Sequence, residues 1–526
     1  MNTRGSWVWI ATAVAVSAAL LPTLSPGIVG LFHDDAIYVA TAKSLADGDG
    51  YHLANLPGAP VQTKYPPFFP GLLALLWKIT PGFPQNVLAL KSLNLVFIAI
   101  LLVAMVKLIQ QHVAGAAWPV LLLGQLVLVT NPGMVSFADF TMTDVLFTTL
   151  VTVALALWGR GAPRAYGGMA LLAIVAIALL TRSVGISLVA AIVFVSAVQR
   201  RYRESLVYAA VAFAIMASWT LWGRLHRGGD RSVLVDYYQT YETPAIAHVI
   251  SDPALAWQIV IGNCRMAVDS LIFVLGPVWT FVGPLLLAVS IVGVYRLARS
   301  AGAIVLVFTV CYLGTVLLHP FAPHRYLLPL MPVFVLCLVA GASWPWQMNQ
   351  RARSRQWATA ASTAALAIVL AGNLLWLRFT PWRSENVRGW YGMSMGYTWS
   401  GFEETFAWIR QNTDPHARLA GLFDPMYFLY TGRQAVRPWF HRPESYFYPY
   451  GNAVPFVGRA PDVARELRAL GVEYLVLDPP KGYAEGAAAV SMLRALVTLP
   501  EVNARRVFVS ADGQHEVYRL WHSGIS

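Results

Sequence analysis

About eleven apolar segments, several of them short, follow one another through the first 377 residues of this 526-residue chain. A lipid bilayer accepts helices that satisfy their own backbone hydrogen bonds, and about 20 apolar residues cross its hydrocarbon core. We therefore expect a polytopic α-helical membrane protein. Its predicted membrane helices lie at residues 7–29, 86–110, 116–132, 139–158, 165–181, 184–199, 205–224, 268–297, 301–319, 325–343 and 357–377.

Composition supports the same class. Hydrophobic residues make up 57% of the chain and charged residues only 12%, which excludes a disordered chain, a fibrous chain and an ordinary cytosolic enzyme. The net charge of +12 would suit nucleic acid, but the basic residues lie in short loops between apolar segments, as they do in membrane proteins. The three cysteines form no CxxC motif and predict neither a disulfide framework nor a zinc site.

Two apolar runs need a separate interpretation. The first segment is longer than the apolar part of a usual signal peptide, so we expect it to remain as a membrane anchor. Residues 66–80 begin with two prolines and are too short to cross a bilayer alone, which predicts a re-entrant or interfacial piece.

The charges of the loops predict the orientation of the chain in the plasma (inner) membrane. With the N-terminus in the cytoplasm, each following inside loop is basic, whereas the opposite loops contain aspartates. An odd number of crossings then places the C-terminus outside. The basic inside loops contain Lys107, Arg160 with Arg164, Arg200 with Arg201 and Arg203, Arg296 with Arg299, and Arg351 with Arg353 and Arg355.

This topology divides the chain into two domains. Residues 1–377 form a transmembrane domain with two long outer loops, at 30–65 and 225–267, the second containing Tyr237, Tyr238 and Tyr241. Residues 378–526 have soluble composition and predict an extracytoplasmic α/β domain. Its predicted helices are Glu403–Arg410 and Asp462–Leu470, the latter followed by Gly471, and its strands are Leu419–Phe423, Glu473–Leu477, Arg506–Ser510 and His515–Leu520.

Carboxylates gather at the outer ends of the predicted membrane helices. Asp34 and Asp35 directly follow the first segment and precede a helical stretch at Ala36–Ala46, where the helix dipole favours negative charge. One of the two could serve only as a helix cap, but an adjacent pair at a membrane boundary indicates a function. Asp139 is compatible with a structural role at a helix start, whereas Asp144 lies deeper and favours function.

Basic residues lie on the same predicted side. Lys64, in Lys64-Tyr65-Pro66-Pro67, is either a lysine that reaches the lipid headgroups or a functional group. Arg182 and Arg325 lie in short outer loops against the charge rule and suggest anion binding, since guanidinium groups bind phosphate through two hydrogen bonds. Arg224, Arg227 and Arg231 could extend this basic surface.

Together these residues suit a reaction in which carboxylates perform acid–base chemistry and cations stabilise a phosphate leaving group. The sequence contains no P-loop, no HExxH motif and no GxSxG motif, which disfavours ATP-driven transport and serine-triad hydrolysis.

Several of these motifs, in their order along the chain, resemble the GT-C membrane glycosyltransferases. The resemblance is to the branch of protein O-mannosyltransferases and lipid A aminoarabinose transferases. It rests on residues 33–45, Gly48, Gly50-Tyr51, 64–70, 143–147, 180–182 and 325–329.

This resemblance implies that a sugar passes with inversion from a polyprenyl-phosphate donor to a protein, lipid or glycan acceptor on the extracytoplasmic side. It also implies catalytic roles for Asp34, Asp35 and Asp144, with Asp34 as the base. Lys64, Tyr65, Arg182 and Arg325 are then expected to bind the donor phosphate.

One departure from this family concerns the metal. The aminoarabinose branch has a carboxylate just before its Lys-Pro-Pro, whereas Thr63-Lys64-Tyr65-Pro66-Pro67 has none. A divalent ion held by Asp34 and Asp144 therefore stays an optional cofactor.

Two other classes of protein are alternatives to a glycosyltransferase. A transporter or flippase for a lipid-linked sugar would need ionisable residues near the bilayer midplane and an inverted repeat, and neither is evident. A non-catalytic membrane scaffold would leave Asp34, Asp35 and Asp144 without a role. We therefore expect a membrane glycosyltransferase.

Overall fold

The protein is described here by a computed structural model. It describes residues 3–113, 115–158, 165–227, 232–240, 251–274, 279–299, 302–319, 324–347, 352–379, 386–388, 394–440, 457–480 and 484–521. Among the residues on which the predictions rest, Arg160, Arg164, Arg231, Tyr241 and Arg351 lie outside these ranges.

The described part of residues 3–379 is almost entirely helical. Its first helices are α1 (Thr3–Ala18), η1 (Leu21–Thr23), α2 (Asp34–Asp47), α3 (Phe68–Ile79), α4 (Val87–His112), α5 (Trp118–Val129), α6 (Pro132–Ala138), α7 (Thr143–Trp158) and α8 (Ala165–Thr181). They are followed by η2 (Ser183–Gly185), α9 (Ile186–Val198), α10 (Tyr202–His226), α11 (Val233–Thr240), α13 (Pro253–Val274), α14 (Trp279–Ala298), α15 (Ala303–Leu317), η3 (His324–Leu330), α16 (Met331–Gln347) and α17 (Ala352–Phe379).

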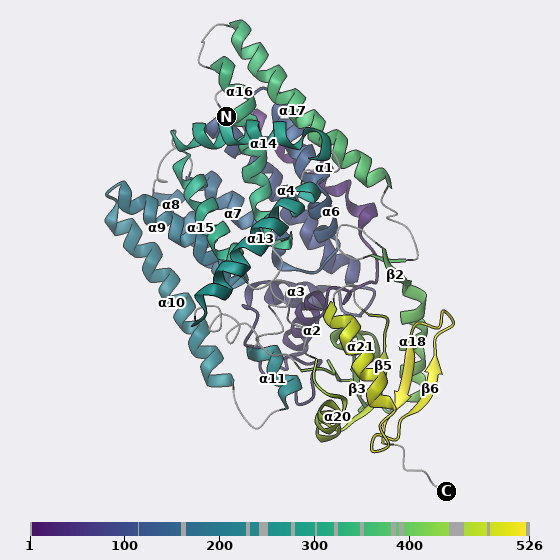
Figure 1. The fold of residues 1–526 in the computed structure, drawn as a ribbon. Coiled ribbons are helices and arrows are strands. Elements are labelled where there is room, and N and C mark those ends of the chain that lie inside the picture. The colour runs from purple at the N-terminus through teal and green to yellow at the C-terminus, as the bar shows by residue number, and fades with distance from the viewer. Residues whose placement is uncertain are drawn as a thin grey trace.

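The C-terminal part mixes helices and strands. Its elements are β1 (Asn386–Arg388), β2 (Ser394–Thr398), α18 (Trp399–Asn412), β3 (Arg418–Gly421), α19 (Asp424–Thr431), β4 (Ala435–Val436), α20 (Ala460–Ala469), β5 (Val472–Leu477), α21 (Ala484–Val497), β6 (Arg505–Val509) and β7 (Glu516–Arg519). Figure 1 shows this part at one end of the helical body, on the far side from the N-terminus, with α2, α3 and α11 close to it.

The prediction of a polytopic helical protein is confirmed, with fewer full-length spans than the sequence predicts. Among the described helices, four are long and apolar enough to cross a membrane, and two bent pairs raise this number to six. The four are Val87–His112, Tyr202–His226, Arg325–Trp344 and Ser354–Phe379. Other predicted segments, such as α7 and α8, are helical but shorter than a full span.

Local breaks shorten three of the predicted segments. The segment 116–132 becomes α5 and α6, which meet at 57° where Asn131 caps α6 and a proline begins it. The segment 139–158 begins only at Thr143, so Asp139 lies at the end of α6 rather than at a helix start. The segment 268–297 is divided between α13 and α14, and α13 already begins at Pro253, inside the predicted loop.

The C-terminal domain contains a five-stranded sheet in the order β4-β3-β5-β7-β6. β3 is parallel to β4 and β5, whereas β7 is antiparallel to β5 and β6. The predicted helices and strands of this domain are confirmed with small differences at their ends. Helices α19 and α21 and strands β1, β2 and β4 were not predicted from the sequence.

Helix α19 and strand β4 both pack against the first loop, by which we mean residues 30–65. The backbone N–H of Ala435 donates to the carbonyl of Asn55 at 2.8 Å. Gly30 has φ of +109°, and a Cβ atom there would lie 2.5 Å from Cβ of Met426. Only glycine therefore allows the loop and helix to approach this closely, and the contact fixes the segment that leads into α2.

Candidate active site

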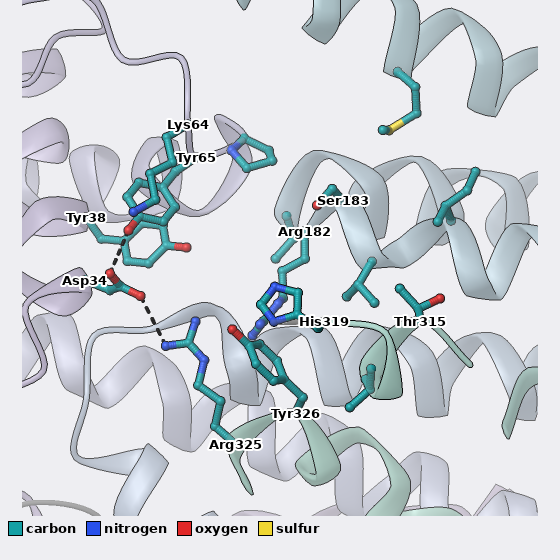
Figure 2. Close-up of a pocket in the computed structure, with 16 residues that line it drawn as sticks. Asp34, Tyr38, Lys64, Tyr65, Arg182, Ser183, Thr315, His319, Arg325 and Tyr326 are labelled. Atoms are coloured by element: carbon teal, nitrogen blue, oxygen red, sulfur yellow. Dashed lines mark hydrogen bonds and ion pairs between the residues drawn. The ribbon is translucent and has the colours of Figure 1, made fainter. Parts of the chain in front are cut away.

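A cavity of about 310 Å³ opens where the first loop faces α10, α15 and the residues around Arg182 and Arg325 (Figure 2). Five of the seven residues that the sequence predicts as catalytic or phosphate-binding line it. The full lining consists of Asp34, Tyr38, Lys64, Tyr65, Pro66, Thr181, Arg182, Ser183, Val184, Ile186, Met216, Thr315, Val316, His319, Arg325 and Tyr326.

Asp34 is the only carboxylate that lines this cavity in the described part of the chain. It begins α2, and its Oδ1 accepts a hydrogen bond from the hydroxyl of Tyr65 at 2.7 Å. Its Oδ2 accepts one from Nη1 of Arg325 at 3.1 Å, and both bonds are drawn in Figure 2. Burial raises the pKa of Asp34, but Lys64 and Arg325 outweigh it and hold that pKa below its ordinary value of 3.8. Asp34 is therefore ionised at neutral pH.

Three cations reach the cavity from three distant segments. Lys64 comes from the end of the first loop, Arg182 from the junction of α8 and η2, and Arg325 from η3. The guanidinium groups of both arginines lie over the ring of Tyr326, 5.3 and 5.1 Å from its centroid. These contacts hold the two charges side by side. Arg182 and Arg325 therefore line one space, and their predicted binding of the donor phosphate stays a prediction.

The segment that carries Lys64 is fixed by hydrogen bonds from both sides. The side-chain oxygen of Gln62 accepts from the backbone N–H groups of Lys64 and Tyr65, at 2.9 and 3.3 Å. Nη2 of Arg227 donates to the carbonyl of Thr63 at 3.3 Å. Arg227 thus supports the loop rather than lining the cavity, and exposed Arg224 does not line it either.

Asp144 does not reach the cavity, contrary to its predicted catalytic role. Its side chain is 1% exposed, and its Oδ1 accepts from Nη1 of Arg182 at 2.6 Å and lies 3.8 Å from Nε of Arg325. The carboxylate of Asp144 thus lies behind two guanidinium groups and outside the cavity lining, and its catalytic role stays a prediction. Asp144 orients the two arginines and balances their charge.

Asp35 is also directed away from the cavity, again contrary to the prediction of a catalytic role. It is 2% exposed, and its Oδ2 accepts from the backbone N–H of Gly30 at 2.8 Å. Burial raises the pKa of Asp35 to about 6, against the hydrogen bond from Gly30 and the charge of Lys91. Its role is to close the turn that precedes α2.

Asp139 has the structural role that its position suggested, although at the end of α6. Its two oxygens accept from the backbone N–H and the hydroxyl of Ser25, at 2.6 and 2.8 Å. Oδ1 also accepts from Nζ of Lys91, a buried lysine, at 2.8 Å. The three residues tie the start of the chain to α4 and α6.

The cavity also has apolar lining residues that were not singled out from the sequence. They are Val184, Ile186, Met216 and Val316. His319 and Tyr326 also line the cavity, and their rings lie 4.9 Å apart. Tyr326 could have been found as the aromatic neighbour of Arg325, whereas His319 stands at the end of an apolar segment and gives no pattern.

The residues present do not fit the optional metal ion. In the described ranges, no three His, Cys, Asp or Glu side chains gather into a possible metal site. The guanidinium group of Arg325 bridges the two predicted ligands, 3.1 Å from Oδ2 of Asp34 and 3.8 Å from Oδ1 of Asp144. Both carboxylates are therefore already balanced by fixed cations.

Comparisons with known proteins find similarity only at the level of structure. No protein-family model matches the sequence, and no curated protein matches it. The crystal structure of ArnT from Cupriavidus metallidurans bound to undecaprenyl phosphate has a TM-score of 0.58 and 14% sequence identity, over 98% of both chains.

Two structures of the oligosaccharyltransferase of Archaeoglobus fulgidus are similar as well. One, a complex with zinc and sulfate, has a TM-score of 0.59 and 12% identity, over 96% of this chain and 72% of that one. The other, AglB with an inhibitory peptide and a dolichol-phosphate, has a TM-score of 0.57 and 11% identity, over 99% and 75%. These likenesses show that the chain shares the fold of these proteins, as the sequence motifs predicted.

Proposed function

We propose that this protein is an integral-membrane glycosyltransferase that moves a sugar from a polyprenyl-phosphate donor to an extracytoplasmic acceptor with inversion. The observation that carries the proposal is the cavity in which one ionised carboxylate, Asp34, faces three fixed cations. A phosphate leaving group needs neutralisation of its charge, and an attacking hydroxyl needs a base. This cavity offers both.

The charged and the apolar lining residues of the cavity match the two ends of a prenyl phosphate. Lys64, Arg182 and Arg325 would bind the phosphate. Apolar residues such as Ile186 and Met216 would receive the prenyl chain. The undecaprenyl phosphate bound to ArnT and the dolichol-phosphate bound to AglB support this assignment.

The proposed reaction is a single displacement. Asp34 accepts the proton of the acceptor hydroxyl while the oxygen of that hydroxyl bonds to the anomeric carbon of the sugar. The bond between that carbon and the phosphate oxygen breaks, and the polyprenyl phosphate leaves with its negative charge stabilised by the three cations. Attack from the side opposite the leaving group inverts the configuration at the anomeric carbon.

Arg325 links donor binding to the strength of the base. In the free protein it pairs with Asp34 and keeps the proton affinity of that carboxylate low. A bound phosphate would compete for the same guanidinium group, and the loss of this pairing would raise the proton affinity of Asp34. The base would then be strongest when the donor is in place.

The proposal also requires a topology with the cavity outside. The alternation of basic and acidic loops supports a cytoplasmic N-terminus and an outer C-terminal domain. Reporter fusions after Arg201 should report the cytoplasm, and fusions after Leu377 the outside. A cytoplasmic reporter after Leu377 would contradict an extracytoplasmic transfer.

The direct experiment uses the purified full-length protein in liposomes with a panel of polyprenyl-phosphate sugars that carry labelled hexoses or pentoses. We expect release of polyprenyl phosphate and transfer of label to a hydroxyl acceptor for one donor of the panel. Movement of the intact donor across the bilayer without cleavage would identify a flippase instead. Binding without cleavage or movement would favour the scaffold.

A further inference from the structure

The residue before Asp34 has a strained backbone. His33 has φ of +73° and ψ of −58°, a backbone conformation that residues other than glycine rarely adopt. Such a conformation persists only where the surrounding structure holds it. The backbone N–H of Ile37 donates to the carbonyl of His33 at 3.2 Å, so this strained residue forms part of the first turn of α2. Its conformation therefore sets the direction in which Asp34 leaves the loop.

The C-terminal domain supplies the contact that holds His33. Nε2 of His33 donates to Oδ1 of Asp424 at 2.9 Å, and both side chains are buried, at 7% and 0% exposed. Asp424 is the first residue of α19. Helix α19 also secures the preceding backbone, since the hydroxyl of Tyr430 accepts from the N–H of Val29 at 3.0 Å and donates to the carbonyl of Gly27.

The second oxygen of Asp424 serves another part of the cavity. Oδ2 accepts from the hydroxyl of Tyr238 in α11 at 2.6 Å, and Nδ2 of Asn55 lies 3.4 Å from it. Next to Tyr238, the ring of Tyr237 lies against the ammonium group of Lys64, 5.7 Å from its centroid. One buried carboxylate thus contacts the neighbours of two residues that line the cavity.

We propose that Asp424 is a positioning residue through which the C-terminal domain sets the catalytic geometry. Its Oδ1 fixes Asp34 through His33, and its Oδ2 fixes Lys64 through Tyr238 and Tyr237. The inference rests on the proposed function, in which Asp34 is the base and Lys64 binds the donor phosphate. The two halves of this contact act on different steps, because one places the base and the other places a phosphate-binding cation.

Kinetic measurements on the full-length protein separate the contact of Asp424 with His33 from its contact with Tyr238. His33→Ala removes the hydrogen bond to Asp424 but keeps a Cβ atom at a positive φ. We therefore expect kcat to fall about 10- to 100-fold with KM for the donor unchanged. Tyr238→Phe removes one hydroxyl, and we expect KM for the donor to rise about 3- to 10-fold with kcat unchanged. Asp424→Ala should show both effects. His33→Gly should lose less turnover than His33→Ala, because glycine adopts this backbone without strain.

A matched control tests whether the effect is only loss of stability. Asp478 is a similarly buried carboxylate of the same domain, and its hydrogen bonds go to Leu422, Tyr427 and His515 rather than to the first loop. Asp478→Asn should lower the melting temperature without changing kcat per folded molecule or KM. If Asp424→Ala and Asp478→Asn behave alike at equal folded fraction, Asp424 is merely structural and the positioning role is wrong.

A second readout does not depend on turnover. We expect Asp424→Ala to accelerate hydrogen exchange of residues 33–37 at least tenfold, whereas Asp478→Asn leaves this exchange unchanged. Unchanged exchange in Asp424→Ala would overturn the positioning role even where the wild type transfers sugar. A wild type that transfers no sugar would instead overturn the proposed function, and the exchange result would still decide whether Asp424 holds the first turn of α2.

Discussion

Asp34 and Arg325 lie 291 positions apart in the chain and meet as an ion pair, with Nη1 of Arg325 3.1 Å from Oδ2 of Asp34. The pair joins the first turn of α2 to η3, the segment that precedes α16. Because Asp144 contacts the same guanidinium group from behind, Arg325 stands between a carboxylate that faces the cavity and one that does not. This arrangement separates the roles of the two aspartates.

Removal of either arginine should weaken binding of the lipid phosphate. A charge-assisted hydrogen bond contributes about 1.5–3 kcal/mol, so Arg182→Ala or Arg325→Ala should raise the Kd for polyprenyl phosphate about 10- to 150-fold. A fluorescent polyprenyl phosphate in detergent measures this affinity. Arg224→Ala, at an exposed arginine outside the cavity, is the matched control. Unchanged affinity in both single variants and in the folded double variant would mean that these arginines only orient their segments.

Asp35 should make stability depend on pH in a defined window. Its pKa is about 6 in the folded protein and 3.8 as the ordinary value, so between these values only the folded state holds the proton. The free energy of unfolding therefore falls as the pH rises from about 4 to about 6, by about 3 kcal/mol in all.

Melting temperatures of Asp35→Asn and the wild type, measured from pH 4 to pH 7, check this sign. The melting temperature of Asp35→Asn should rise relative to that of the wild type as the pH rises. Asparagine can still accept the hydrogen bond from Gly30, but it never ionises. Exposed Asp49→Asn should show no such trend. If the melting temperature of the wild type instead rose relative to that of Asp35→Asn with rising pH, the raised pKa of Asp35 would be contradicted.

Removal of divalent ions should leave the reaction intact. The guanidinium group of Arg325 already bridges Asp34 and Asp144, so the transfer needs no metal between them. Incubation with EDTA, followed by a transfer assay with and without added Mg²⁺ or Mn²⁺, should change turnover by less than about twofold. Loss of turnover in EDTA with recovery on adding a divalent ion would restore the metal site that the sequence left optional.

The sequence predicts well those features, such as helices and strands, that are determined by the residues of a single segment. The helices appear where apolar runs lie, and the strands near Leu419 and Leu475 follow from local hydrophobic patterns. Asp34 could be singled out because an adjacent pair of carboxylates at a membrane boundary is unusual, and Arg325 because it lies in a short outer loop against the charge rule. Each of these signals is local.

The direction of a side chain and the contacts between distant segments could not be predicted in this way. Asp34 and Asp35 are neighbours on one helix turn, yet one faces the cavity and the other Gly30. The burial of Asp144 depends on where two arginines from other segments lie. Asp424 lies 391 positions from His33 in a domain of ordinary soluble composition, so no pattern marked it.

The role of Asp34 as the base is the central claim, and one pair of variants tests it most directly. Asp34→Asn keeps the shape of the side chain and removes its basicity, so turnover should fall about 10²- to 10⁴-fold. Polyprenyl phosphate should bind this variant at least as tightly as the wild type, because asparagine competes less for the guanidinium group of Arg325. Asp35→Asn, at the next residue, should keep near-normal turnover because its carboxylate faces Gly30. Near-normal turnover of purified Asp34→Asn together with an inactive, folded Asp144→Asn would contradict the account and make the deeper aspartate the base.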